Sequence, residues 1–288
     1  MPRISFRPIM ATLIVIVVLI LPAALAAQSF WLERSPGKTF LLEIFKPNIS
    51  SGVYNGVRYP VDYSFETFAL FLSLRWPMGS KYFLVAELPF AHAAFDTKID
   101  RAFSFYRFNG HSNTIGNPYL GLERGSFEIG LRLPLAKTDN NYAAPVGMAA
   151  DVDRREAFES YAALRATVNY QAKRLFFWKL PQSWALRYRF GAIILRNFDH
   201  FRDNYFAFPL NFQIGYQTAR IQLGINNASW IGALRQYRDR IQSSFTRDSD
   251  FTIHAEGEGG FTASIKFGNL RPGLYIGSSF GLNLNIQR

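Results

Sequence analysis

Large apolar residues and polar residues alternate along most of this chain. The stretch SFEIGLRLPLAK, residues 126–137, has apolar side chains at every second position, namely Phe127, Ile129, Leu131, Leu133 and Leu135. A period of two is typical of a β-strand with one apolar and one polar face. Between the apolar positions stand Glu128, Arg132 and Pro134. Because proline has no N–H to give to a sheet, we expect Pro134 at the external rim of the strand or at a bulge.

The same period predicts about twelve strands, with ten or fourteen as alternatives. The predicted strands are 39–45, 67–76, 82–90, 115–123, 126–137, 161–171, 184–194, 206–216, 220–226, 251–257, 261–267 and 274–286. Most of these strands have a length close to the roughly 9–11 residues that a tilted strand needs to cross a bilayer.

The connections between these strands differ in length in an alternating way. Short connections are expected at 77–81, 124–125, 218–219 and 258–260, and long polar ones at 48–62, 93–113, 137–156 and 232–250. Two connections fit less well, because 172–183 is long for a turn and 269–273 is short for an external loop. Short turns at one end and long loops at the other indicate an up-and-down antiparallel transmembrane β-barrel.

The composition of the two faces favours a membrane barrel over a soluble periplasmic β-protein. A closed sheet in lipid pairs all of its backbone groups and needs an apolar exterior. A soluble sandwich or lipocalin-type barrel alternates too, but it usually exposes many Lys and Glu residues. Here charged residues are only 18% and aromatic residues 16% of the chain, and the polar positions are mostly small or amide side chains.

The N-terminus predicts export from the cytoplasm. Arg3 and Arg7 precede an apolar run, and small residues at 24–26 form an Ala-x-Ala cleavage pattern. These features predict a signal peptide at residues 1–27, the alternative being an uncleaved anchor helix, and a single barrel domain at 28–288. We therefore expect the outer membrane of a Gram-negative-type bacterium. The chain has no cysteine, so disulfides do not contribute.

Three strands share a phrase, ELPFA at 87–91, RLPLA at 132–136 and AFPLN at 207–211. Together with NTIGNPYLGLERGSFEIGLRLPLA at 113–136, they resemble the outer-membrane family of transporters of the meta-pathway of phenol degradation. Gly116, Gly121 and Leu122 match that family's hairpin motif, whereas Asn117 stands where the family has aspartate. The resemblance implies a pore-like uptake role for small, hydrophobic or aromatic molecules. The last strand also resembles the C-terminal insertion signal of outer-membrane proteins, although the chain ends in Gln287 and Arg288.

Catalytic and metal-binding patterns are weak. GHSN at 110–113 is similar to the His-x-Ser-Asn pattern of outer-membrane lipid hydrolases. However, His111 and Ser112 are adjacent, so their side chains would point to opposite faces of a strand. Asp151 and Asp153 suit calcium, yet Arg154 and Arg155 beside them favour a solvated external loop. We expect no enzyme activity, metal or cofactor.

Partners are predicted from the net charge of +11 and from the polar faces. The basic string RQYRDR at 235–240 is expected in an external loop, where it would meet lipopolysaccharide phosphates or only solvent. The lumen-facing candidates are Arg75, Glu87, Glu128, Arg132, Arg165, Arg187, Arg189 and Lys266.

The charged lumen-facing residues allow two interpretations. They would select small solutes in a channel or pair with one another in a closed structural or adhesive barrel. Arg187 and Arg189, two positions apart on one strand, motivate the hypothesis of a preference for anionic solutes.

Overall fold

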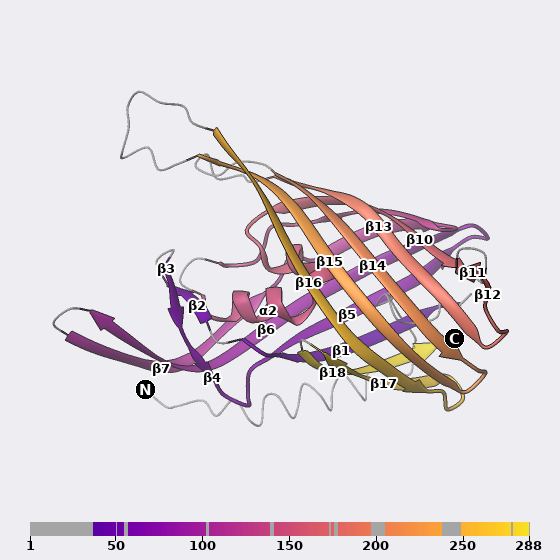
Figure 1. The fold of residues 1–288 in the computed structure, drawn as a ribbon, viewed down its shortest axis with the longest axis horizontal. Coiled ribbons are helices and arrows are strands. Elements are labelled where there is room, and N and C mark those ends of the chain that lie inside the picture. Colours follow the sequence, from indigo (N-terminus) through magenta and orange to yellow (C-terminus); the bar gives the residue numbers. More distant parts are fainter. Residues whose placement is uncertain are drawn as a thin grey trace.

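The computed structural model shows a closed β-barrel with one connecting segment folded into its lumen (Figure 1). The structure describes residues 37–49, 51–54, 57–101, 104–138, 141–172, 174–175, 178–196, 205–237, 249–277 and 279–287. The predicted signal peptide and residues 238–248 lie outside the described residues. No helix in the described part of the chain is long and apolar enough to cross a membrane.

The wall of the barrel consists of twelve antiparallel strands. They are β1 (Thr39–Pro47), β5 (Phe68–Met78), β6 (Tyr82–Arg101), β8 (Tyr119–Arg124), β9 (Phe127–Arg132), β10 (Ala162–Ala172), β13 (Trp184–Arg196), β14 (Tyr205–Gln217), β15 (Ile221–Tyr237), β16 (Ser249–Ile265), β17 (Leu270–Gly277) and β18 (Ser279–Gln287). Each strand pairs with the next in this order, and β18 pairs with β1 to close the ring. Closure leaves the sheet without an open edge, as is required of a β-sheet in the hydrocarbon core of a membrane.

Minor strands lie outside this ring. β7 (Ser104–Ile115) continues the pairing with β6, and β4 (Asp62–Tyr63) also pairs with β6. β2 (Ser51–Tyr54) pairs with β3 (Val57–Pro60), and β11 (Arg174–Leu175) pairs with β12 (Trp178–Lys179). The predicted loop 93–113 is therefore wrong for the most part, since β6 and β7 extend through it as a hairpin that projects from the barrel (Figure 1).

The count of twelve is right, but the predicted boundaries of the last strands are wrong. The turn predicted at 258–260 does not exist, because β16 pairs with β15 without a break from Ser249 to Ile265. Gly260 serves close packing rather than a turn, since a Cβ there would lie 2.3 Å from the ring of Tyr275. The strand predicted at 274–286 is in fact two strands, β17 and β18, which pair as a tight hairpin.

The two ends of the barrel differ. Short turns at 79–81, 125–126, 218–220 and 266–269 lie at one end, here called the turn end, where β1 begins and β18 finishes. The connections at the other end, here called the loop end, are mostly longer. The predicted external loop at 269–273 is wrong, because Leu270 already starts β17 at the turn end.

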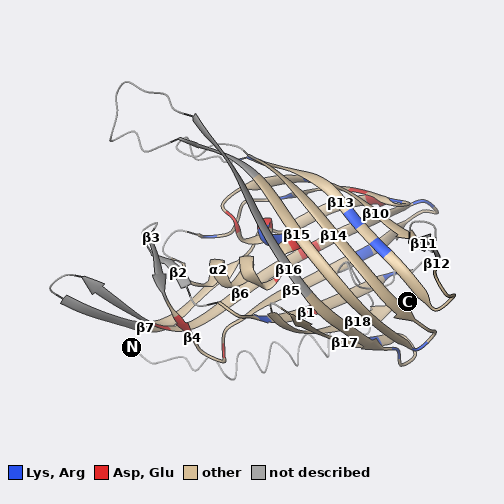
Figure 2. Cartoon of the chain, viewed as in Figure 1, with Lys and Arg blue, Asp and Glu red and all other residues tan. Residues whose placement is uncertain are grey.

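Most large apolar side chains of the strands face outward and most charged and amide ones inward, apart from the apolar residues that pack against α2. In the opening stretch Phe127 is 46% and Leu135 58% exposed, whereas Arg132 is 3% exposed. Figure 2 shows that the barrel wall is largely uncharged, with short charged segments in its middle, on β13 and near the turns. β9 ends at Arg132, so Pro134 follows the last paired residue, as its missing N–H predicts.

A β-bulge interrupts the wall where β7 passes into β8. Pairing with β6 stops at Ile115 opposite Phe90 and resumes at Tyr119 opposite Glu87. The three residues 116–118 therefore face only two residues of β6, which is the geometry of a bulge. The predicted strand at 115–123 is broken at this point. A Cβ on Gly116 would lie 2.5 Å from the carbonyl oxygen of Ala157, so glycine permits the close approach of the segment in the lumen.

That segment, residues 141–161, connects β9 to β10 and is called here the lumen segment. It contains α2 (Ala143–Ala150) and the 3₁₀-helix η1 (Val152–Phe158). α2 contacts β1, β5 and β6, and η1 contacts β14, β15 and β16, so the segment reaches across the barrel. The prediction of a solvated external loop at 137–156 is wrong for the described residues from 141 onward, because an almost entirely apolar helix and reciprocal charges draw the connection inward.

Candidate functional site in the barrel lumen

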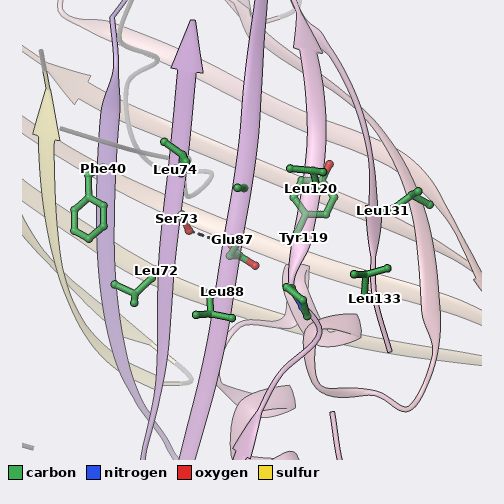
Figure 3. Close-up of a pocket in the computed structure, with 12 residues that line it drawn as sticks. Phe40, Leu72, Ser73, Leu74, Glu87, Leu88, Tyr119, Leu120, Leu131 and Leu133 are labelled. Carbon is green, nitrogen blue, oxygen red and sulfur yellow. Dashed lines mark hydrogen bonds between the residues drawn. The ribbon is translucent and has the colours of Figure 1, made fainter. Parts of the chain in front are cut away.

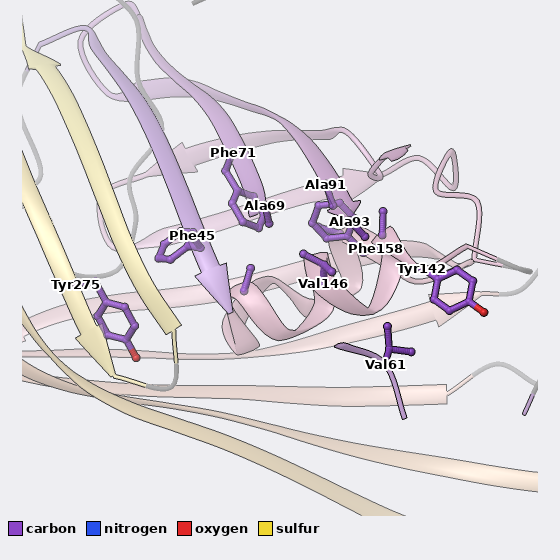
Figure 4. Packing of buried hydrophobic residues seen from close by; sticks show 13 residues of the cluster. Phe45, Val61, Ala69, Phe71, Ala91, Ala93, Tyr142, Val146, Phe158 and Tyr275 are labelled. Carbon is purple, nitrogen blue, oxygen red and sulfur yellow. The ribbon is translucent and has the colours of Figure 1, made fainter. Parts of the chain in front are cut away.

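The first half of the lumen segment is held by apolar packing. Figure 4 shows α2 among inward-facing side chains of β1, β5 and β6. Val146 and Phe158 are fully buried in this cluster, and the ring of Phe158 meets that of Phe71 edge-on with centroids 5.8 Å apart. Tyr142, just before α2, stacks on Phe95 with ring centroids 3.9 Å apart. The apolar sequence AAPVGMAA therefore forms a helix that is buried against the wall rather than exposed to solvent.

Gly147 fixes how the two halves of the lumen segment fold on each other. A Cβ at this position would lie 2.3 Å from the ring of Phe158. Because any larger residue would push the ring away, glycine lets η1 fold back onto α2.

The second half of the lumen segment is held by ion pairs. Arg154 on η1 reaches two strands at once, with Nη1 donating to Glu43 Oε2 on β1 at 2.7 Å and to Glu87 Oε2 on β6 at 2.9 Å. Its Nη2 also lies 2.6 Å from Asp151 Oδ2. The guanidinium lies over Phe71, 3.9 Å from the ring centroid. One arginine thus connects the lumen segment to neighbouring parts of the wall.

Asp153 and Glu156 make the opposite contacts. Asp153 accepts from Arg165 Nη2 on β10 and from Arg189 Nη1 on β13, both at 2.6 Å. Glu156 Oε1 accepts from Arg165 Nη1 at 2.7 Å and from Arg132 Nε on β9 at 3.1 Å. The lumen segment therefore offers one cation and two anions to a wall that carries the complementary charges.

The electrostatic field of the wall sets the protonation of the lumen segment. Burial alone would raise the pKa of the Asp153 carboxyl, but Arg165 and Arg189 hold that pKa well below its usual range. Burial disfavours the charged form of Arg154, yet the carboxylates of Asp151, Glu43 and Glu87 raise its pKa well above the usual value. Both side chains are therefore charged at neutral pH, as the ion pairs require.

The predicted lumen residues are brought together only in part. Arg75 pairs with Glu123 at 2.9 Å, and Arg132 Nη2 donates to Glu87 Oε1 at 2.7 Å. Glu128 does not contact Arg132, but accepts from Tyr119 Oη at 2.8 Å. The cluster thus combines the predicted Arg75, Glu87, Arg132, Arg165 and Arg189 with residues of the lumen segment.

Arg187 and Lys266 lie nearer the turn end. Arg187 donates to the amide oxygens of Gln213 (3.2 Å) and Gln217 (2.6 Å). Lys266 follows the last residue of β16, in the turn before β17, where its backbone N–H donates to Arg220 O. Neither side chain belongs to the charged cluster around η1.

Sequence reasoning missed the lumen segment as the centre of this site. Asp153, Arg154 and Glu156 were interpreted as solvated loop residues, but they are 4%, 5% and 0% exposed. The available signal was the mixed charge of VDRREAF directly after an apolar run, opposite strands whose inner faces also carry mixed charge. Which of these charges meet depends on the path of the chain in three dimensions.

Asn117, at the bulge, ties the wall to the lumen segment. Its Nδ2 lies within hydrogen-bond distance of the carbonyl oxygens of Glu156, Glu159 and Tyr161 at 2.6–3.2 Å. Its Oδ1 accepts from the backbone N–H groups of Leu135 and Ala136. An amide can donate and accept at once, whereas a carboxylate can only accept. The asparagine in place of the family's aspartate therefore matches its surroundings.

Amide side chains line the part of the lumen formed by β14 to β18. Inward-facing positions of β14 to β18 carry Asn211, Gln213, Gln222, Asn226, Asn283 and Asn285, all of them buried. Several of their atoms have no hydrogen-bond partner within the described part of the protein, including both amide atoms of Asn211 and of Asn283. This amide-lined part of the lumen adjoins the charged cluster, because Asn283 pairs in register with Glu43 of β1 and Asn211 with Arg189 of β13. It also contains the buried Arg271 of β17, which donates to Gln222 Oε1 at 3.1 Å.

His111 and Ser112 do not form a catalytic pair. Ser112 Oγ donates to Asn141 Oδ1 at 2.8 Å, at the start of the lumen segment. His111 instead stacks on His92, with ring centroids 5.6 Å apart. The hydroxyl and the imidazole therefore have different partners, which is consistent with their expected positions on opposite faces.

The outer face carries an apolar hollow of about 480 Å³. Figure 3 shows Phe40, Leu72, Leu74, Leu88, Leu120, Leu131 and Leu133 around it. Ala86 has the smallest side chain among the outward residues of this region and leaves the space between them. Behind this wall, Ser73 Oγ donates to Glu87 Oε2 at 3.3 Å.

Comparisons with known proteins support the fold. No protein-family model matches the chain, and no curated protein matches it. Among solved structures, an outer membrane channel from Pseudomonas putida F1 is similar with a TM-score of 0.50 and 14% identity, covering 91% of this chain and 98% of that one. Two further solved structures are similar at lower TM-scores.

These two structures are the β domain of the Bordetella autotransporter Brka and LpxR from Salmonella typhimurium. Their TM-scores are 0.44 and 0.42 and their identities 11% and 8%, with coverage of 88% and 87% of this chain and of all of the other chains. The protein is an antiparallel 12-strand barrel of the outer-membrane type, a fold that it shares with the Pseudomonas putida channel. Membership of the phenol-pathway transporter family stays a prediction.

Proposed function

We propose that this protein is an outer-membrane channel for small solutes in a Gram-negative-type bacterium, and that its lumen segment narrows the pore. The observation that carries the proposal is the set of buried ion pairs between η1 and β1, β6, β9, β10 and β13. A barrel that only had to close its interior would do so more simply with apolar side chains, because burying charges is costly even when they are paired. A wall lined with charged and amide groups suits a wetted passage.

The proposal includes the surroundings of the barrel. The outward-facing Phe and Leu residues form the band that would meet lipid tails, and the loop end would face the lipopolysaccharide layer. A hydrolytic function is not favoured, because Ser112 and His111 have separate partners.

A closed structural or adhesive barrel is the second candidate. It is favoured by the hairpin of β6 and β7, which projects beyond the barrel and offers a surface for a partner (Figure 1).

Planar-bilayer recording of the purified protein distinguishes these functions. A channel gives stepwise conductance in KCl, and replacing residues 143–158 by a Gly-Ser linker of equal length should raise the conductance of each step. Absence of conductance both in the wild-type protein and in this variant, with correctly folded barrels, would favour the closed barrel.

A further inference from the structure

The interior of the barrel near the turn end carries two arginines whose contacts differ from those of the charged cluster around η1. Arg187 on β13 donates to the amide oxygens of Gln213 and Gln217 on β14, at 3.2 and 2.6 Å. Arg271 on β17 donates to the amide oxygen of Gln222 on β15 at 3.1 Å. An amide holds a guanidinium in place but, unlike a carboxylate, brings no negative charge to it.

These contacts determine which amide atoms remain for a ligand. Gln217 and Gln222 pair in register across β14 and β15, and the oxygen of each amide accepts from an arginine. Each amide therefore has its Nε2 group left to offer, which is a hydrogen-bond donor and suits an anion. Among the described residues neither Nε2 donates a hydrogen bond, although Gln222 is only 4% exposed.

A small hollow of about 10 Å³ lies between these side chains. Arg187, Gln213, Gln217 and Gln222 line it, and Gly215 on β14 has no side chain to fill it. Among the described residues around the hollow, Arg187 is the charged one and none is a carboxylate. A space of this size accepts about one water-sized group, so one oxygen of a larger ion can enter while the rest of that ion lies in the lumen.

We infer that this hollow binds one oxygen of a small carboxylate solute, and that it makes the turn end of the lumen prefer anions. The inference rests on the proposed channel function and gives it a substrate class. Arg187 and the two Nε2 groups donate to the oxygen, and hydrogen bonds to a charged acceptor are stronger than neutral ones. Arg271, which binds the oxygen of Gln222, adds a second positive charge. Arg189, the other arginine of the sequence-based hypothesis, takes no part, because Asp153 of the lumen segment binds it at 2.6 Å.

Planar-bilayer recordings under a potassium acetate gradient test this preference. The reversal potential of wild-type channels should show that acetate passes more easily than K⁺, and conductance should saturate as the salt concentration rises, because the ion binds on its way. In Arg187→Gln the reversal potential should move toward that of K⁺. The concentration at half-saturation should rise about tenfold, because a hydrogen bond to a charged group is lost.

Arg220→Gln is the matched control. Arg220 is exposed in the turn between β14 and β15, so this variant removes the same charge at the same end of the barrel but outside the hollow. It should change neither the reversal potential nor the concentration at half-saturation. A second variant, Gln217→Leu, removes one Nε2 donor and keeps both arginines. It should raise the concentration at half-saturation while the channel still prefers acetate.

The outcomes separate this inference from the channel function. Heat-modifiable migration in gels shows that each barrel has folded. No conductance in the wild-type protein would sink the channel proposal itself. Normal conductance together with a preference for K⁺ in the wild-type protein, with unchanged values in both Arg187→Gln and Gln217→Leu, or with an equal effect of Arg220→Gln, would overturn this inference alone.

Discussion

Arg154→Met is the sharpest perturbation of the lumen segment. Arg154 is the ion-pair partner that the structure gives to Glu43 within its described residues, and it also binds Glu87 and Asp151. Methionine keeps most of the length of the side chain and can still lie against the ring of Phe71 in place of the guanidinium, so the change removes charge more than volume. The carboxylates of Glu43 and Asp151 are then buried without their cation.

The magnitude follows from the burial of this site. Removing one partner of a buried ion pair costs about 3–5 kcal/mol. Because about 1.4 kcal/mol corresponds to a factor of ten, the docked state of the lumen segment should lose a factor of about 100 or more against the undocked state. The wall keeps its own ladder of backbone hydrogen bonds, so the barrel should persist while the segment leaves it.

Single-channel recording in planar bilayers measures this change. We expect larger conductance steps and more flicker in Arg154→Met than in the wild-type protein. Arg155→Met is the matched control, because Arg155 is the next residue but is partly exposed and pairs with Glu159 four residues on. Its loss should therefore cost less than the loss of the contacts of Arg154 with three carboxylates.

Heat-modifiable migration in gels checks that each barrel has folded. Identical steps and noise in wild-type and Arg154→Met channels would refute the reasoning. A second variant that also carries Glu43→Met should recover part of the docking, because it removes the carboxylate left without its cation.

Four other outcomes are expected. Asn117→Asp should loosen the lumen segment and raise conductance, because a carboxylate would face three carbonyl oxygens. Each lost hydrogen bond should cost about 1–3 kcal/mol. The control Asn48→Asp, at an exposed position, should leave conductance unchanged. Gly147→Ala usually stabilises a helix by about 1 kcal/mol, but here it should lower thermal stability, because its Cβ meets Phe158 at 2.3 Å; a higher melting temperature would contradict the packing. Cysteines in place of Ser112 and Asn141, whose side chains touch, should form a disulfide in this cysteine-free chain. If the lumen segment moves, this disulfide should change the conductance steps, so equal steps in oxidant and in reductant would contradict such movement. The difference in conductance between Asp153→Asn and the wild-type protein should persist from pH 8 to about pH 4 and shrink only below that. The pKa of Asp153 is lower in the docked state than its ordinary value, so the charged carboxylate stabilises docking above that ordinary pKa, and this effect is lost as the pH falls through the lowered pKa. A difference in conductance that disappears by pH 6 would contradict this prediction.

The sequence by itself determined the barrel and the orientation of its strands. Alternation is a local property, so the exposed Phe127, Ile129 and Leu131 and the buried Arg132 could be assigned to opposite faces from their positions alone. The rim position of Pro134 was equally predictable, because the reason lies in a single residue, although the predicted strand 126–137 runs past the end of β9 at Arg132. Glycines were harder to interpret. Gly260 looked like part of a turn, whereas its role is to lie under the ring of Tyr275 on the neighbouring strand.

Only the tertiary structure decided what the lumen contains. Asp153, Arg154 and Glu156 bind residues of the wall that lie 9 to 111 positions away along the chain, and nothing in the local pattern specifies such partners. The sequence of a mixed-charge connection is the same whether water or a barrel wall surrounds it, because each residue fixes its own charge but not which residue lies beside it in space. The sequence therefore predicted that Arg132 and Arg165 face a lumen, and the fold decided that they hold a segment of the same chain there.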